Sequence, residues 1–130
     1  MARVVGLFHA TLPVEDLERA EAFYRDFLGI RRHATPSPFP ETVVFLDLGN
    51  TMIHLVRRRD GTPAIDPRAT HLAIEVDDID ALFEVAKQRG VTLLSEAIVA
   101  RPDFRCFFFL DPDQNRVELT QHGPAPADDR

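Results

Sequence analysis

The sequence predicts an α+β fold built from two copies of one βαβββ module, and three observations lead to this prediction. A segment that begins at His9 returns in altered form at His71, an offset of 62 (71 − 9). Each copy runs into a stripe of apolar residues with helical spacing that ends at a glycine. Three short runs with the composition of strands follow each stripe. Equivalent modules are therefore expected at about 4–59 and 68–121.

The repeated segments resemble each other position by position. Residues 9–17 read HATLPVEDL and residues 71–79 read HLAIEVDDI. Both begin with histidine, carry apolar residues at alternate positions and end with two acidic residues before an aliphatic one. Alternation of this kind indicates a strand with one covered face. An internal repeat at this spacing favours a duplicated supersecondary unit.

Each repeated strand is expected to lead into a helix. Asp16 and Asp78 occupy N-cap positions, where a carboxylate accepts hydrogen bonds from unpaired amides of the first turn. Gly29 and Gly90 follow the apolar stripes, where the chain leaves a helix in a left-handed conformation. Both helices are therefore predicted to begin just after an aspartate and to end just before a glycine.

The remaining segments complete the modules and bound the domain. Extended runs are predicted at 30–33, 42–48 and 51–57 in the first module, and at 92–94, 105–110 and 116–121 in the second. A proline- and glycine-bearing linker is expected at 60–67, and a flexible tail at 123–130. The chain thus reads as a single domain over residues 1–122.

Composition excludes several classes of protein. The net charge of −6 argues against binding nucleic acid, which requires a basic face. No apolar segment is long enough for a signal peptide or a membrane span, so a cytoplasmic location is expected. Cys106 is the single cysteine of the chain, so an intramolecular disulfide is impossible.

The alternation of the strands predicts a metal site. Residues on one face of each strand are apolar and should be covered by the helix; in the first strand these are Phe8, Ala10, Leu12 and Val14. The opposite faces of four repeat-related strands carry side chains that bind metals: His9, His54, His71 and Glu118. Histidine with carboxylate suits Fe(II), Mn, Ni, Co or Zn. If the two sheets pair, these side chains converge on one concave surface.

Other residues are candidates for contacts with a substrate. Arg105 could clamp a substrate carboxylate, and Phe107 or Phe109 could line a pocket, although the Phe107–Phe109 run reads equally as core. The basic run 57–59 is either a solvated strand end or the entrance of a binding site, where its positive charge would attract an anionic substrate. His33 and His122 fall outside the repeat and are expected at the surface.

These motifs resemble the vicinal oxygen chelate superfamily, which includes glyoxalases, bleomycin-resistance proteins and extradiol dioxygenases. The motifs are His9 with VEDL at 14–17, IHL at 53–55, HLAI at 71–74, and DPD at 111–113 through VEL at 117–119. The resemblance implies that the two modules form an open, cupped β-barrel. It also implies a divalent metal ion held by His9, His71 and Glu118, with His54 as a fourth ligand or a neighbouring base.

The resemblance implies a strategy rather than a single reaction. The ion would chelate two adjacent oxygens of a small molecule while Glu118 or His54 moves a proton, as in a glyoxalase-like lyase or isomerase. The alternatives are an extradiol-type ring-cleaving dioxygenase and a small-molecule-binding resistance protein. A homodimer is also implied, with each site formed within one chain or across two.

Two positions depart from the pattern of the superfamily. Glyoxalase I typically has glutamate at the position of His54, which argues against lactoylglutathione lyase activity. Gln114 stands where many members have glycine in a turn. It must therefore avoid a left-handed conformation or bear modest strain.

Overall fold

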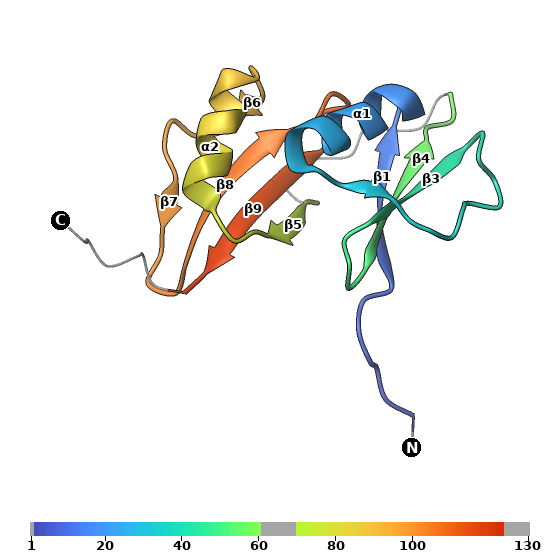
Figure 1. The fold of residues 1–130 in the computed structure, drawn as a ribbon, viewed down its shortest axis with the longest axis horizontal. Helices are drawn as coiled ribbons and strands as arrows, with labels where there is room; N and C mark the ends of the chain where they lie inside the picture. Colours follow the sequence, from blue (N-terminus) through green and yellow to red (C-terminus); the bar gives the residue numbers. More distant parts are fainter. Residues whose placement is uncertain (1, 61–69, 124–130) are drawn as a thin grey trace. The chain divides into compact units, whose positions relative to one another are not determined.

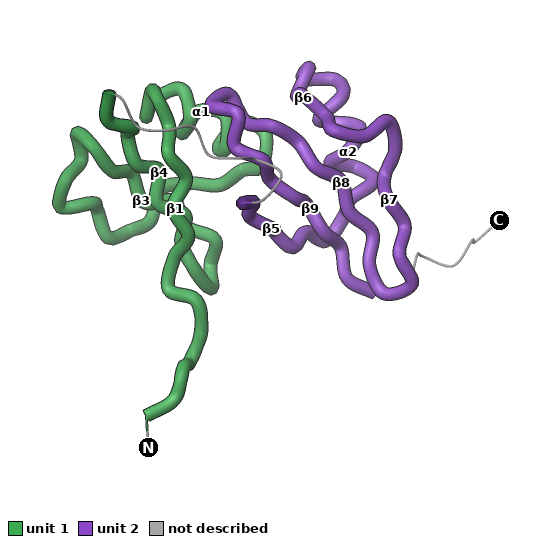
Figure 2. The backbone as a smooth tube through the Cα atoms, turned by 180° about the vertical axis from the view of Figure 1, so that it is seen from behind, with its two compact units in different colours: residues 1–64 green, residues 65–130 purple. Residues whose placement is uncertain are grey.

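The computed structural model describes residues 2–60 and 70–123, which belong to two compact units, Met1–Ala64 and Ile65–Arg130 (Figure 2). Residues 61–67 of the predicted linker and residues 124–130 of the predicted tail lie outside the described residues. Within the described part of the chain, no helix has the length and hydropathy needed to cross a membrane.

The first unit is a four-stranded mixed sheet with one helix (Figure 1). Its elements are β1 (His9–Val14), α1 (Leu17–Leu28), β2 (Arg31–Arg32), β3 (Val43–Asp47) and β4 (Met52–Arg57). The strand order is β1-β4-β3-β2. β1 and β4 are parallel, and the other neighbours are antiparallel. This topology brings the first and last strands of the module side by side.

The second unit repeats this topology. Its elements are β5 (Leu72–Glu75), α2 (Ile79–Gln88), β6 (Thr92–Leu93), β7 (Val99–Ala100), β8 (Phe104–Leu110) and β9 (Arg116–His122). The order is β5-β9-β8-β6, β5 and β9 are parallel, and β7 also pairs with β8. The predicted α+β class with two βαβββ modules is confirmed. β7 was not predicted, because its two residues carry no alternation and, unlike those of β2 and β6, do not directly follow a helix.

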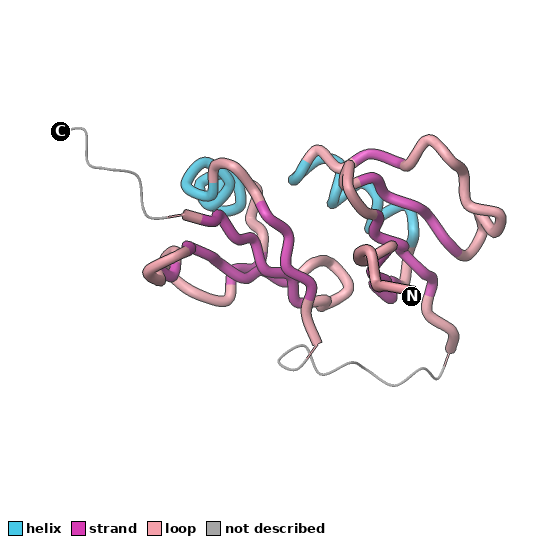
Figure 3. Tube along the Cα trace, turned by 90° about the horizontal axis from the view of Figure 1, so that it is seen from below, coloured by secondary structure: helices cyan, strands magenta, loops and turns pink. Residues whose placement is uncertain are grey.

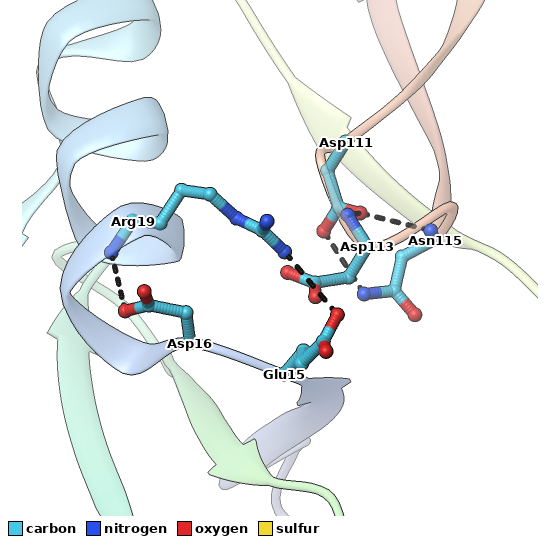
Figure 4. Close-up of polar contacts among 6 residues, drawn as sticks. All are labelled: Glu15, Asp16, Arg19, Asp111, Asp113 and Asn115. Atoms are coloured by element: carbon cyan, nitrogen blue, oxygen red, sulfur yellow. Dashed lines mark hydrogen bonds and ion pairs between the residues drawn. The ribbon is translucent and has the colours of Figure 1, made fainter.

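The predicted helix ends are confirmed in both units. The Asp16 side chain accepts a hydrogen bond from the Arg19 amide at 3.1 Å (Figure 4), and Asp78 accepts one from the Ala81 amide at 3.0 Å. Gly29 and Gly90 have φ angles of 71° and 70°. These are left-handed values that favour glycine over residues with a Cβ.

In each unit the helix lies against one face of the strands (Figure 3), and the core fills the space between them. The fully buried residues of the first unit include Val14, Tyr24 and Leu55. The prediction that Phe8 belongs to this covered face is wrong, since its side chain is 75% exposed. The physical reason is that β1 begins only at His9, so Phe8 lies outside the sheet.

A tight turn joins β8 to β9 and contains Gln114, the residue that stands where many members of the superfamily have glycine. The buried Asp111 carboxylate accepts hydrogen bonds from the Asp113 and Asn115 amides and from Asn115 Nδ2, each at 2.9 Å (Figure 4). Gln114 lies inside this turn with a φ of 66°. Of the two alternatives for Gln114, the structure shows the left-handed conformation, which the Asp111 hydrogen bonds hold in place.

Candidate functional site

The first unit brings His9 and His54 together on the sheet face opposite α1. β1 and β4 are adjacent and parallel, and the covered neighbours Ile53 and Leu55 turn His54 to the open face. The imidazole rings of His9 and His54 stack with centroids 3.7 Å apart and planes 10° apart. Phe45, which pairs with His54 across β3 and β4, stacks on the His54 ring at 4.0 Å.

In this stacked arrangement, one nitrogen of each imidazole has no hydrogen-bond partner. His9 Nδ1 and His54 Nε2 are both buried and have no hydrogen-bond partner. Burial, with a smaller contribution from His9, lowers the pKa of His54. A neutral imidazole nitrogen that is buried without a donor or acceptor carries a desolvation penalty, and a bound cation would remove that penalty.

The second unit brings His71 and Glu118 together. Glu118 lies on β9 between the fully buried Val117 and Leu119, and it pairs with Ala73 of β5. The distance from His71 Nε2 to Glu118 Oε1 is 3.5 Å. Two atoms bound to one tetrahedral ion at about 2.1 Å each lie about 3.4 Å apart. The two donors of this unit are therefore spaced as ligands of a common ion would be.

The open face of the second unit continues beyond these two donors. The Thr120 hydroxyl donates a hydrogen bond to Glu118 Oε2. Phe108 pairs with Glu118 across the strands, lies edge-on to the His71 ring at 5.6 Å and has the Arg116 guanidinium 4.1 Å from its ring centroid. Sequence reasoning missed Phe45 and Phe108. Alternation along β3 could have identified Phe45, whereas three consecutive phenylalanines conceal which face of β8 Phe108 occupies.

Two predicted substrate contacts lie on the opposite, helix-covered face of β8. Phe107 is fully buried and its ring lies 5.1 Å from that of Phe83 in α2. Arg105 Nη1 contacts both carboxylate oxygens of Asp80 at 3.0 Å, and its side chain is 13% exposed. The expectation that Arg105 and Phe107 contact substrate is therefore corrected, because alternation places both beside α2 and turns Phe108 to the open face.

A pocket lies on the open face of the second unit next to Glu118. It is lined by Ala73, Ile74, Glu75, Phe104, Glu118, Thr120 and His122. His122 Nδ1 contacts Glu75 Oε2, and both side chains are largely exposed. His122 is therefore at the surface, as predicted, and it also borders this pocket. In the first unit, His33 Nδ1 accepts a hydrogen bond from the Thr35 amide at 3.0 Å.

Cys106 is also close to this face but is a poor metal ligand. Its side chain is buried, and burial together with the charge of Glu118 raises the pKa of its thiol. Metals bind the thiolate rather than the thiol. The donors that fit a divalent ion are therefore the imidazoles and the carboxylate.

Each unit thus supplies one pair of the four predicted donors. His9 and His54 meet in the first unit, and His71 and Glu118 meet in the second. The described residues contain no group of three or more His, Cys, Asp or Glu side chains placed to hold a metal ion. The chemistry of each pair, and the two buried imidazole nitrogens without hydrogen-bond partners, are compatible with binding a divalent metal ion.

The comparisons with known proteins identify the family. The model of the Glyoxalase/Bleomycin resistance protein/Dioxygenase superfamily matches residues 6–119. The chain belongs to this superfamily, which confirms the resemblance found in its motifs.

Curated relatives include enzymes with different reactions. The chain is 31% identical to "Glutathione transferase FosA" of Serratia marcescens over 118 residues, covering 88% of this chain and 79% of the relative. It is 34% identical to mitochondrial methylmalonyl-CoA epimerase of Homo sapiens over 117 residues, covering 82% of this chain and 66% of the epimerase. The family is therefore defined, whereas the reaction differs among its members.

Solved structures agree with the observed fold. A crystal structure of a glyoxalase family protein from Bacillus anthracis matches with a TM-score of 0.77 and 25% identity. The match covers 94% of this chain and 98% of that one.

Proposed function

We propose that the protein is a divalent-metal-dependent enzyme that acts on a small molecule carrying two neighbouring oxygen atoms. The observation that carries this proposal is the pairing of donors at equivalent places in both units: His9 with His54, and His71 with Glu118. The ion, whether Fe, Mn, Ni, Co or Zn, would be held by His9, His71 and Glu118. When bound, it would supply Lewis-acid stabilisation of negative charge on the substrate oxygens.

The geometry of the first unit supports different roles for its two histidines. A metal ion lies close to the plane of each imidazole that binds it. The rings of His9 and His54 are stacked and almost parallel, so one ion cannot lie in both planes in this orientation. We therefore assign His9 as the ligand and place His54 beside the ion, where its nitrogen would accept a hydrogen bond or a proton from the substrate.

In the second unit, Glu118 would have two functions. One carboxylate oxygen faces His71 and would bind the ion, while the carboxylate as a whole can exchange a proton with a substrate bound next to it. The pocket that extends from Glu118 to His122 offers space for the part of the substrate that does not react. Phe104 and Ile74 supply apolar contacts there, and His122 with Glu75 supplies polar ones.

We place the reaction among lyases and isomerases that move a proton at carbon. The similarity to an epimerase at 34% identity supports this class. The alternatives are a ring-cleaving dioxygenase and a small-molecule-binding resistance protein. A homodimer in the cytoplasm is part of the proposal, with the two pairs of donors meeting within one chain or across two.

The proposal is tested by metal analysis followed by activity assays. Protein purified without chelator should contain about one divalent ion per chain, as one complete ligand set predicts. The His71→Ala and Glu118→Ala variants should lose it, whereas the control variant His33→Ala should retain it. Wild-type protein that binds no divalent metal would overturn the proposal and favour a resistance protein.

The metal-loaded protein then separates the reaction classes. Epimerisation of methylmalonyl-CoA, or thioester formation from methylglyoxal and glutathione, would place the enzyme among isomerases and lyases. Oxygen consumption with catechols by the iron-loaded protein would instead favour the dioxygenase.

A further inference from the structure

Glu118 is held by a buried hydroxyl that none of the roles above includes. Thr120 lies two residues further along β9, so its side chain points to the same face of the sheet as Glu118. Its hydroxyl donates to Glu118 Oε2, while the other carboxylate oxygen, Oε1, lies 3.5 Å from His71 Nε2. The two oxygens of Glu118 therefore have different partners.

We propose that Thr120 is a positioning residue, which holds the Glu118 carboxylate so that Oε1 stays directed at the metal position. This inference rests on the proposed metal site and adds a residue to its outer shell. A ligating carboxylate without such a hydrogen bond can rotate, and fixing it in advance lowers the entropic cost of binding the ion.

The surroundings of Thr120 make it a rigid donor. Its side chain is 7% exposed, and the Val76 amide donates to its carbonyl oxygen at 2.9 Å, which fixes the backbone against the adjoining chain. The buried Cys106 lies opposite it on β8. A β-branched side chain in a strand has few χ1 rotamers, so the hydroxyl cannot easily turn away from Glu118.

The first unit shows that this place in the sheet does not itself require a hydroxyl. Thr120 follows Glu118 by two residues, and Val56 follows His54 by two residues in the equivalent strand β4. Valine has nearly the same shape as threonine but no hydroxyl to donate a hydrogen bond. The hydroxyl is therefore present in the unit with the proposed carboxylate ligand, Glu118, and is replaced by a methyl group in the unit that has His54 at this place.

The test compares Thr120→Val with Thr120→Ser in the full-length protein, using calorimetric titration of the metal-free form with Zn²⁺. We expect Thr120→Val to weaken Zn²⁺ binding about 10- to 100-fold, which is typical of losing an outer-shell hydrogen bond. Thr120→Ser keeps the hydroxyl and should restore most of the affinity. Thr92→Val makes the same chemical change on the edge strand β6, which β8 separates from β9, and should leave the affinity unchanged.

Thermal unfolding of each metal-free variant separates positioning from a general structural role. Thr120→Val should unfold near the wild-type temperature, because valine is accommodated at the equivalent position 56. Equal Zn²⁺ affinity in wild type and Thr120→Val, or an equal loss in the Val and Ser variants, would overturn the role of Thr120 alone. Failure of the wild type to bind Zn²⁺ or any other divalent ion would instead overturn the proposed function.

Discussion

Replacing Phe107 or Phe108 by alanine tests which face of β8 each side chain occupies. Phe107 is fully buried against Phe83 of α2, whereas Phe108 is partly exposed beside His71 and Arg116. Truncating a fully buried phenylalanine removes its burial energy and leaves a cavity, which together cost about 3–5 kcal/mol. Phe108→Ala should cost only about 1 kcal/mol, because its side chain is only partly buried.

Guanidinium unfolding followed by circular dichroism would measure both losses at 25 °C. The free energy of unfolding should fall much further for Phe107→Ala than for Phe108→Ala. The metal affinity should show the opposite order, since Phe108 contacts the ring of His71. Equal destabilisation by the two variants, or a greater loss from Phe108→Ala, would refute the assignment of Phe107 to the core.

Three further predictions concern local features of the two units. Gln114→Gly should raise the free energy of unfolding by about 0.5–1 kcal/mol, because removing the backbone strain of a left-handed non-glycine residue outweighs the entropic cost of glycine. An unchanged free energy of unfolding, measured with denaturant, would contradict the observed φ of 66°. Asp78→Ala should lower the free energy of unfolding by about 1 kcal/mol through loss of the helix cap. Its control, Asp77→Ala, should change the free energy of unfolding little in the same assay. In the metal-free protein, the lowered pKa of His54 means that the folded state resists protonation, so the free energy of unfolding should fall as the pH drops below 6.5 towards the folded pKa. His54→Phe should weaken that pH dependence, and an unchanged slope between pH 7.5 and 5.5 would show that His54 is not its source.

Periodic patterns carried most of what the sequence could predict. The repeat defined both modules, and the caps at Asp16 and Asp78 located the helix starts correctly, because these features depend on neighbouring residues only. Alternation in β4 and β9 turned His54 and Glu118 to the open face, since apolar residues flank both of them.

The errors occurred where the pattern itself was ambiguous. Three consecutive phenylalanines, 107–109, give no alternation, so the faces of Phe107 and Phe108 could not be distinguished without the register between β8 and β9. Arg105 was a candidate for substrate contact because it enters its strand from a proline-bearing loop. Its actual partner, Asp80, lies on another element, so the sequence did not reveal the ion pair. The Thr120–Glu118 hydrogen bond depends on side-chain rotamers, which strand periodicity does not predict.

The most direct test of the shared metal site is X-ray absorption spectroscopy of the protein loaded with one equivalent of Co²⁺. We expect two imidazole nitrogens and a carboxylate oxygen among the atoms that coordinate Co²⁺, with one imidazole lost in either His9→Ala or His71→Ala. A shell that keeps the same number of imidazoles in both variants would contradict a single ion shared by the two repeated units.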